Sequence, residues 1–224
     1  MAKDDITKSF KLIGTRPNRP DGFEKVTGRA KYGADISAVG MLHGAVLRSP
    51  YAHARIKSIN FEKAAKLEGV KAIITRDDFP KDRDGEPLKL LENTIAGEIA
   101  YYDGHAIAAV AATSVFTAKE ALKEIEVEYE VLPHVIDVDE AMKPDAPIVR
   151  ANAGDFSVPE GSSPNVASYI EFGRGDITNG FDKADIVKSG LFKTEAAHQG
   201  YIEPHACMAQ LDHNGQGEMW VCTQ

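Results

Sequence analysis

Residues 103–131 read DGHAIAAVAATSVFTAKEALKEIEVEYEV, and this stretch decides the fold class. It opens with an Asp-Gly turn signal, and the apolar run over 105–112 is typical of a strand that is buried on both faces. Thr117 and Glu120 have the spacing of a capping box, which predicts a short helix that ends near Glu124. The first part of this stretch therefore predicts a strand followed by a helix.

Apolar side chains then alternate with glutamates, which is the pattern of a half-buried strand. The apolar positions are Ile125, Val127, Tyr129 and Val131, and the acidic positions are Glu126, Glu128 and Glu130. Like charges on one face of a strand repel unless water screens them. We therefore expect the glutamates to form a solvated face rather than a catalytic carboxylate cluster.

The same order of elements occurs upstream. Residues 41–48, 55–59 and 70–75 are strand candidates, because they are short, apolar or alternating, and bounded by turn residues. Asn60 is placed to cap a helix after the second of them, and Gly69 can take the left-handed conformation that ends such a helix. Two strand–helix–strand units in succession predict an α/β or an α+β domain, and we expect the α+β class.

Changes in composition divide the chain into four parts. Residues 1–20 are polar and read as a flexible N-terminal arm, residues 21–136 form the α+β domain, and residues 137–165 are a linker punctuated by proline and glycine. Residues 166–224 form a second block that we predict to run as strands, with a hairpin turn at the Asn-Gly pair 214–215. The last strand stops at a polar residue with nothing after it, which predicts an unfinished β-layer with open edges.

Composition excludes several classes of protein. The chain has 224 residues and a formal net charge of -8, which argues against a nucleic-acid partner. No apolar run of about 18 residues is present to span a membrane, and residues 1–8 do not resemble an export signal. Cys207 and Cys222 are the only cysteines and fit no metal-binding spacing, so we expect two buried thiols in a cytoplasmic protein.

Two groups of polar residues invite a catalytic or metal-binding interpretation. His198, Glu203 and His205 carry side chains that zinc accepts, but their spacing matches no established zinc pattern. His53 could act in catalysis, although its place within the first domain favours a histidine that packs and makes hydrogen bonds. We therefore expect no zinc site at these three residues and a structural role for His53.

Several segments together resemble the molybdenum-binding subunit of the xanthine dehydrogenase and aldehyde oxidase family. They follow one another in the family's order from about residue 16 onward. The segments are 21–36, 47–56, 103–112, 128–137, 175–176, 181–187, 201–204 and 219–224. Within the family, the chain resembles the 4-hydroxybenzoyl-CoA reductase type and the nicotinate or purine hydroxylases.

The resemblance implies a fold and a site. Residues 21–136 would be the family's α/β hammerhead domain, a mainly structural and interface module. Residues 166–224 would be the first β-strands of an incomplete molybdopterin-binding domain. Gln224 would lie beside the molybdenum and form a hydrogen bond with its oxo ligand, and Cys222 stands where the family often has serine. A neutral amide donor suits an oxo ligand because it adds no charge.

The sequence also departs from the family pattern. The glycine-rich segment that follows Gln224 in the family, the later pterin-binding loops and the general-base glutamate are absent. Two cysteines cannot hold an iron–sulfur cluster, so iron–sulfur and FAD subunits would have to carry electrons away. We therefore expect a chain that contributes to a molybdenum–molybdopterin site completed by the remainder of the molybdenum subunit.

Two other functional hypotheses remain open from sequence. The chain could be a non-catalytic truncated product or an assembly module that binds partner subunits. It could also be a free-standing small-molecule binder, although no pocket can be recognised from the sequence. The aromatic or N-heterocyclic substrate class comes from the resemblance alone.

Overall fold

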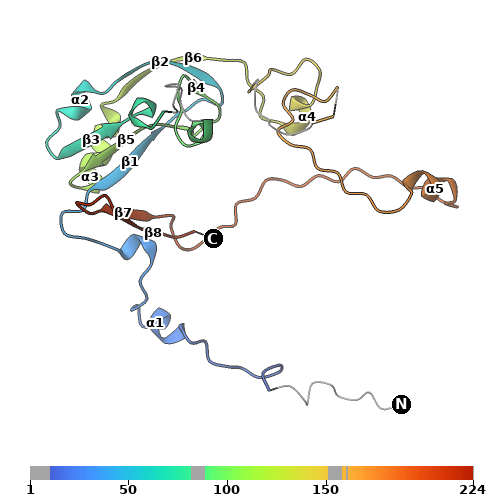
Figure 1. Cartoon of the computed structure of the whole chain (residues 1–224), viewed down its shortest axis with the longest axis horizontal. Coiled ribbons are helices and arrows are strands. Elements are labelled where there is room, and N and C mark those ends of the chain that lie inside the picture. The colour runs from blue at the N-terminus through green and yellow to red at the C-terminus, as the bar shows by residue number, and fades with distance from the viewer. Residues whose placement is uncertain (1–10, 82–88, 151–157, 160, 224) are drawn as a thin grey trace. The chain divides into compact units, whose positions relative to one another are not determined.

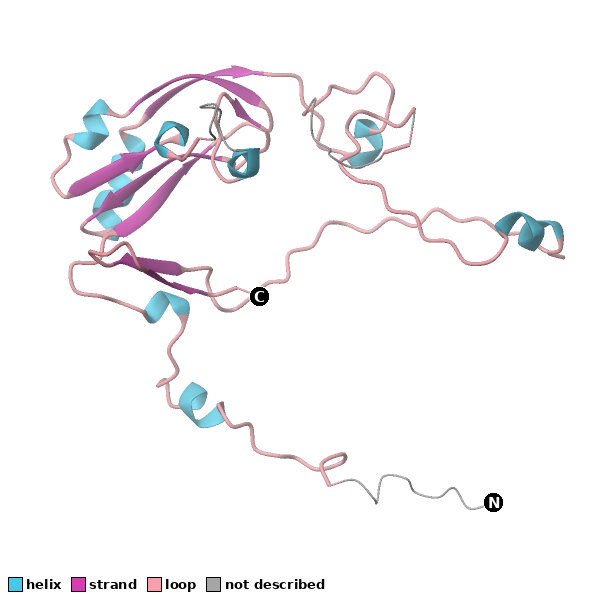
Figure 2. Cartoon of the chain, in the orientation of Figure 1, coloured by secondary structure: helices cyan, strands magenta, loops and turns pink. Residues whose placement is uncertain are grey.

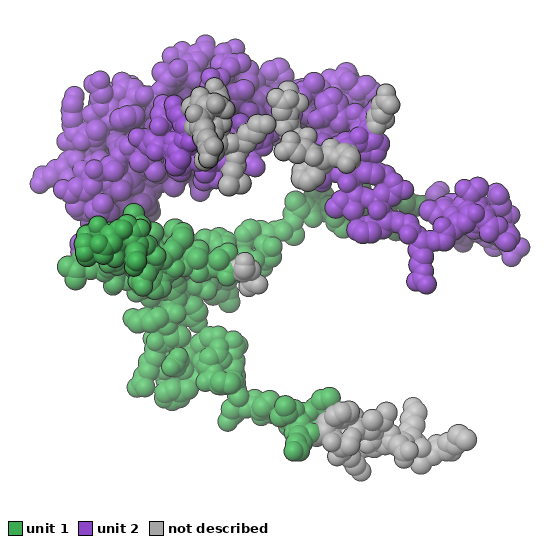
Figure 3. Space-filling view, in the orientation of Figure 1, with its two compact units in different colours: residues 1–39, 190–224 green, residues 40–189 purple. Residues whose placement is uncertain are grey.

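The computed structural model describes residues 11–81, 89–150, 158–159 and 161–223. The chain divides into two compact units (Figure 3): residues 40–189 form one, and residues 1–39 together with 190–224 form the other. Half of the predicted N-terminal arm, residues 1–10, lies outside the described residues. The helices and strands of both units are labelled in Figure 1.

A three-stranded antiparallel sheet forms the centre of the 40–189 unit (Figure 2). Its order is β1 (His43–Arg48), β5 (Ala106–Ala112), β3 (Val70–Ile74), with β5 in the middle. No residue of β5 is exposed, and Ile107, Ala108, Val110 and Ala112 are fully or almost fully buried. The three predicted strands, including the one buried on both faces, are confirmed.

The second sheet has the order β4 (Ile99–Ala100), β2 (Ala54–Asn60), β6 (Glu126–Val131). In β6 the three glutamates are exposed while Val127 and Tyr129 are half-buried, which confirms the predicted alternation. Glu126 accepts a hydrogen bond from Lys63 Nζ at 2.6 Å, and Glu130 lies 3.8 Å from Arg55 Nε. Neighbouring cations and water thus stabilise this acidic face.

The main helix of this unit is α3 (Val115–Lys123), and its N-terminus differs from the prediction. Ser114 is the N-cap, since its Oγ accepts a hydrogen bond from the Thr117 backbone N–H at 3.0 Å. Glu120 does not reach back to a cap but binds Lys123 Nζ at 2.6 Å. The predicted capping box of Thr117 and Glu120 is therefore wrong: the helix begins earlier, because β5 ends at Ala112.

Two side-chain clusters form the hydrophobic core. Ala108 and Val110 of β5 pack with Ala121 of α3 and Ile125, together with Ala64 of α2 (Glu62–Ala65). Ile107, on the opposite face of β5, packs with Ala96 and Ala100. Half-buried side chains from β2 and β6 cover this second cluster; they are Ile56, Ile59, Val127 and Tyr129.

The connection between α2 and β3 depends on a glycine. The predicted N-cap Asn60 is wrong, because Phe61 is the N-cap of α2 and Asn60 ends β2; Asn60 Oδ1 still accepts from the Glu62 N–H at 3.1 Å, one residue before the cap position. Gly69 has φ +91, but α2 already ends at Ala65, so the glycine turns the chain into β3 and does not cap the helix. A Cβ at Gly69 would lie 2.6 Å from Thr113 Oγ1.

We expect Gly69→Ala to lower the free energy of unfolding of the 40–189 unit by about 2 kcal/mol, through backbone strain and the clash with Thr113. Gly104→Ala is the matched control, because Gly104 has φ +85 and a Cβ at this position would meet nothing within 4 Å. Gly104→Ala should lower the free energy of unfolding only through backbone strain, by about 1 kcal/mol. Hydrogen exchange of the β3 and β5 amides measures the loss of stability in both variants. An equal loss in the two would show that Thr113 moves aside freely.

Residues 137–165 contain α4 (Val138–Ala141) and are otherwise irregular where described. Asn165 organises this segment. Its Nδ2 donates to the carbonyls of Ala141 and Pro147 at 3.1 and 3.0 Å, and its Oδ1 accepts from the Val149 N–H at 3.1 Å. One amide side chain thereby holds both ends of the segment together.

The remaining elements are short. They include α1 (Gly22–Val26), α5 (Ile177–Asp182) and the 3-10 helices η2 (Gly33–Asp35), η3 (Arg76–Asp78) and η4 (Lys89–Asn93). Within the described residues, no helix is long and apolar enough to cross a membrane.

The C-terminal block has fewer strands than predicted. Among its described residues, only β7 (Cys207–Leu211) and β8 (Gly217–Val221) are strands, and none occurs between 166 and 206. The predicted strands in that interval are wrong, because apolar and β-branched residues form a strand only where a neighbouring strand pairs with them. The predicted hairpin is confirmed: β7 and β8 pair antiparallel, and Gly215 has φ +79 in the turn.

Candidate functional site

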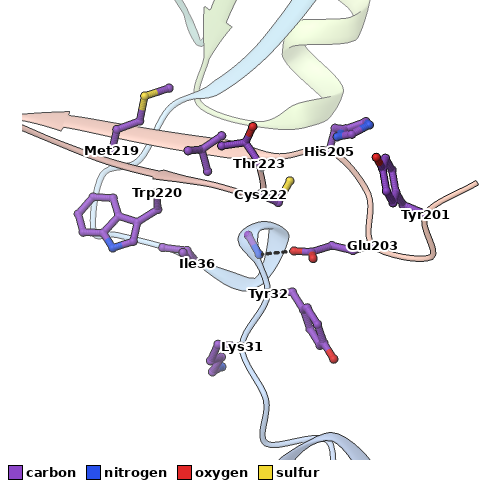
Figure 4. A pocket seen from close by; sticks show the side chains of 12 residues that line it. Lys31, Tyr32, Ile36, Tyr201, Glu203, His205, Met219, Trp220, Cys222 and Thr223 are labelled. Atoms are coloured by element: carbon purple, nitrogen blue, oxygen red, sulfur yellow. Dashed lines mark hydrogen bonds between the residues drawn. The ribbon is translucent and has the colours of Figure 1, made fainter. Parts of the chain in front are cut away.

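A hollow of about 780 Å3 lies beside the β7–β8 hairpin (Figure 4). Its walls come from two stretches that are far apart in sequence but belong to the same compact unit. The N-terminal wall is formed around η2, and the other wall by residues 201–205 and the end of β8. Its principal lining residues are Lys31, Tyr32, Glu203, His205, Trp220 and Thr223.

Glu203 connects the two walls. Its Oε1 accepts a hydrogen bond from the Gly33 backbone N–H at 3.2 Å, across 170 residues of sequence (Figure 4). The rings of His198, Tyr201 and His205 pack edge-to-face beside it, with centroids 5.6 to 6.2 Å apart. The zinc-site alternative is not supported: no cluster of three or more His, Cys, Asp or Glu side chains suited to a metal occurs in residues 11–81, 89–150, 158–159 and 161–223.

Cys222, just after β8, forms hydrogen bonds with residues 204–206. Its Sγ accepts from the Ala206 N–H at 3.0 Å and lies 3.3 Å from the Ala206 carbonyl oxygen, which can accept the thiol proton. The Cys222 N–H also donates to that carbonyl, at 3.3 Å. The prediction of two buried thiols is wrong, because Cys207 is exposed and Cys222 is only half-buried.

Gln224, the predicted cofactor contact, lies outside the described residues, so its role stays a prediction. Its neighbour Thr223 lines the hollow, as does Cys222. The sequence placed Trp220 in the predicted molybdopterin-binding domain but gave no sign that Lys31 and Gly33 lie beside it. The family-like segment 21–36 contains two of them, but no local pattern indicates that it would meet residues 201–206.

His53 and His105 belong to the 40–189 unit and do not line the hollow. His53 is buried, and its Nδ1 lies 2.7 Å from the Pro133 carbonyl oxygen, as expected of a structural residue. His105, which the sequence did not single out, is fully buried, and its Nδ1 accepts from the Tyr101 N–H at 3.2 Å. Burial lowers the pKa of His105 from its usual 6.5; the Glu92 backbone opposes this by a smaller amount, and the nearby Arg150 charge, the smallest of the three causes, lowers the pKa as well.

Comparison with known proteins assigns both parts of the chain. Residues 27–133 match the family described as "Aldehyde oxidase and xanthine dehydrogenase, a/b hammerhead domain", and residues 158–224 match "Molybdopterin cofactor-binding domain". The chain belongs to the xanthine dehydrogenase and aldehyde oxidase family. Its α+β architecture, with a hammerhead followed by strands of a molybdopterin-binding domain, is that of the family's large subunits.

Individual family members are similar over nearly the whole chain. The nicotinate dehydrogenase large molybdopterin subunit of Eubacterium barkeri is 32% identical over 97% of this chain and 48% of its own length. A probable xanthine dehydrogenase subunit of Bacillus subtilis is 35% identical over 95% of this chain and 27% of its own length. The structure of CO dehydrogenase from Oligotropha carboxidovorans superposes with a TM-score of 0.79 at 31% identity, covering 93% of this chain and 27% of that one.

The chain thus spans between about a quarter and a half of the length of these family members. Within that span, the hammerhead contributes the larger packed core, and the hairpin contributes residues of the cofactor-binding domain. The candidate site of this family member is therefore the hollow beside the hairpin, which the hairpin and residues 31–36 line together.

Proposed function

We propose that this chain forms part of the large subunit of a molybdenum hydroxylase and contributes the β8 end to its molybdenum–molybdopterin site. The observation that carries the proposal is the match of residues 158–224 to a molybdopterin cofactor-binding domain, which includes the β7–β8 hairpin beside the hollow. When bound, the cofactor supplies two-electron chemistry that oxidises or reduces a carbon of an aromatic or N-heterocyclic substrate.

The side chains of the hollow suit such a group. Lys31 supplies a positive charge for an anionic pterin, and Thr223 and Cys222 are neutral side chains that can share hydrogen bonds without adding charge. Trp220 offers an apolar face to a planar ring system. Gln224 would donate its amide N–H to an oxo ligand, by analogy with the family.

Further residues would complete the enzyme, since the chain spans only part of the length of its relatives. The remainder of the molybdenum subunit would supply the glycine-rich segment, the pterin-binding loops and the general base. Iron–sulfur and FAD subunits would accept the electrons. The second candidate function is a non-catalytic module that binds partner subunits, and the observation that favours it is the number of large apolar side chains left exposed, among them Phe172, Leu191, Phe192 and Ile202.

Affinity purification of the tagged chain from its native cells distinguishes the two candidate functions. The proposed function predicts molybdenum in the purified material at about one atom per copy of these 224 residues, together with polypeptide that carries the glycine-rich segment. Recovery of partner subunits without molybdenum would favour the assembly module, and recovery of the chain alone and free of metal would contradict both.

Gln224→Ala should lower kcat of the assembled enzyme by roughly a hundredfold, because loss of one preorganised hydrogen-bond donor at a reacting centre has effects of that order. Gln210→Ala is the matched control, since Gln210 is exposed on β7 of the same hairpin. Steady-state rates measured per bound molybdenum distinguish loss of catalysis from loss of cofactor. Equal rates for the two variants would exclude Gln224 from the site.

A further inference from the structure

We propose that Glu203 is a positioning residue that braces the cofactor hairpin against the N-terminal residues 31–36. The placement of the β8 end relative to the hollow then depends on a segment that lies 170 positions away in sequence. The link between this brace and the cofactor rests on the proposed function, whereas the brace itself does not.

The N-terminal side of the brace is a preformed turn. Asp35 closes η2 by accepting from the Tyr32 N–H at 3.1 Å, and its own N–H donates to the Tyr32 carbonyl at 2.9 Å. This leaves the Gly33 N–H at the start of the turn pointing outward to Glu203. A Cβ at Gly33 would lie 3.5 Å from the Ala206 carbonyl oxygen and 3.6 Å from Cys222 Cβ, so the turn packs directly on the hairpin junction.

The Glu203 side of the brace is residues 198–206, which form no helix or strand but are ordered by local contacts. The Gly200 N–H donates to His198 Nδ1 at 3.0 Å, and Gly200 has φ +68, which makes a tight turn. The three packed rings of this segment limit its movement further. Cys222 then connects Ala206 to β8 by the contacts described above.

The contacts form one continuous path from Gly33 through Glu203 and Ala206 to Cys222. A carboxylate suits the central position, because a charged acceptor forms a stronger bond with a backbone N–H than a neutral acceptor does. Glu203 is half-buried, so water competes only in part. Thr223 follows Cys222 directly, and its position at the rim of the hollow is thereby set by the brace.

The boundary of the hammerhead family match differs from the boundary between the two compact units. Residues 27–39 fall within the hammerhead family match, yet they belong to the same compact unit as the hairpin. Their structural role, on this proposal, is to support the cofactor-binding residues rather than the hammerhead core.

Four variants of the full 224-residue chain test the brace. Glu203→Ala removes the acceptor, and Glu203→Gln keeps an oxygen that can accept the same bond. Gly33→Pro removes the donor N–H at a first helical position, where proline is tolerated, and adds ring carbons, whereas Gly33→Ala keeps that N–H and adds only a Cβ. Hydrogen exchange of the β7 and β8 amides is the readout, with the fluorescence of Trp220, the single tryptophan, as a second probe.

We expect Glu203→Ala and Gly33→Pro each to speed exchange of the hairpin amides about tenfold, and Glu203→Gln and Gly33→Ala to change it less than about threefold. The double variant Glu203→Ala/Gly33→Pro should be no faster than either single variant, since both remove the same bond. Additive effects, or a Glu203→Gln variant as fast as Glu203→Ala, would overturn the brace.

Molybdenum content of the assembled enzyme separates this inference from the proposed function. Faster exchange together with reduced molybdenum in Glu203→Ala, and recovery of both in Glu203→Gln, supports the whole proposal. Faster exchange with unchanged molybdenum supports the brace and contradicts the assignment of the hairpin to the cofactor. Unchanged exchange overturns the brace whatever the molybdenum content.

Discussion

Ile107→Ala is expected to lower the free energy of unfolding of the 40–189 unit by about 3 kcal/mol, the largest effect of any single truncation in this core. Ile107 has no exposed surface and is the largest fully buried side chain of the chain's described residues. Its neighbours Ala96 and Ala100 are too small to fill the space that its removal would leave. The cavity would therefore persist, and the loss would include contacts as well as transfer free energy.

Hydrogen exchange of the β5 amides, followed against denaturant, measures this loss within the hammerhead. Ile107→Val is the graded control and should cost about 1 kcal/mol, because it removes one methyl group. Trp220 belongs to the other compact unit, so its fluorescence transition should not shift in either variant. A cost below about 1 kcal/mol for Ile107→Ala would mean that the half-buried side chains of β2 and β6 collapse into the space.

Local patterns in the sequence were enough to predict most of the hammerhead. The apolar run that contains Ile107 and the alternation around Tyr129 each depend on residues within one element, and both strands are where they were predicted. The Asn-Gly pair at 214–215 likewise predicted its own turn. β4 was missed because a strand of two residues has no period and exists only through its pairing with Ala54 and Arg55.

Errors arose where the outcome depends on neighbours distant in sequence. Ser114 and Thr117 can both cap a helix, and the choice between them is made by the point at which β5 ends. The candidate site shows the same limit. Resemblance to the family pointed to Gln224 and Cys222, but the contact of Glu203 with Gly33 spans 170 residues and has no local signature.

Acidification is expected to destabilise the 40–189 unit through His105. The Tyr101 N–H donates to Nδ1, so the neutral ring carries its proton on Nε2, which makes no hydrogen bond within the described residues. Protonation would place a second proton on Nδ1, directed at that N–H. Tyr102 stacks on the ring with centroids 4.4 Å apart, and the Arg150 guanidinium, which lies over Tyr101 and binds Glu92, adds a positive charge nearby.

The lowered pKa of His105 fixes the sign and the pH range of this effect. The unfolded chain binds a proton near pH 6.5, while the folded state binds it only at lower pH, so stability is fully present above 6.5 and is lost as pH falls toward the folded-state pKa. Each unit by which the pKa is lowered corresponds to about 1.4 kcal/mol of stability lost in acid. Below the folded-state pKa the loss should level off, because both states are then protonated.

Denaturant unfolding at several pH values between 7.5 and 5 measures this loss of stability, with hydrogen exchange of the β5 amides as the probe. His105→Asn keeps an oxygen near the position of Nδ1 but cannot titrate, so this variant should be less stable at pH 7.5 and much less sensitive to acid. His134→Asn is the matched control, because His134 is exposed and its replacement should leave the acid sensitivity unchanged. If His105→Asn lost stability in acid as steeply as the native chain, another group would be responsible, and the buried ring would not be the origin of the pH dependence.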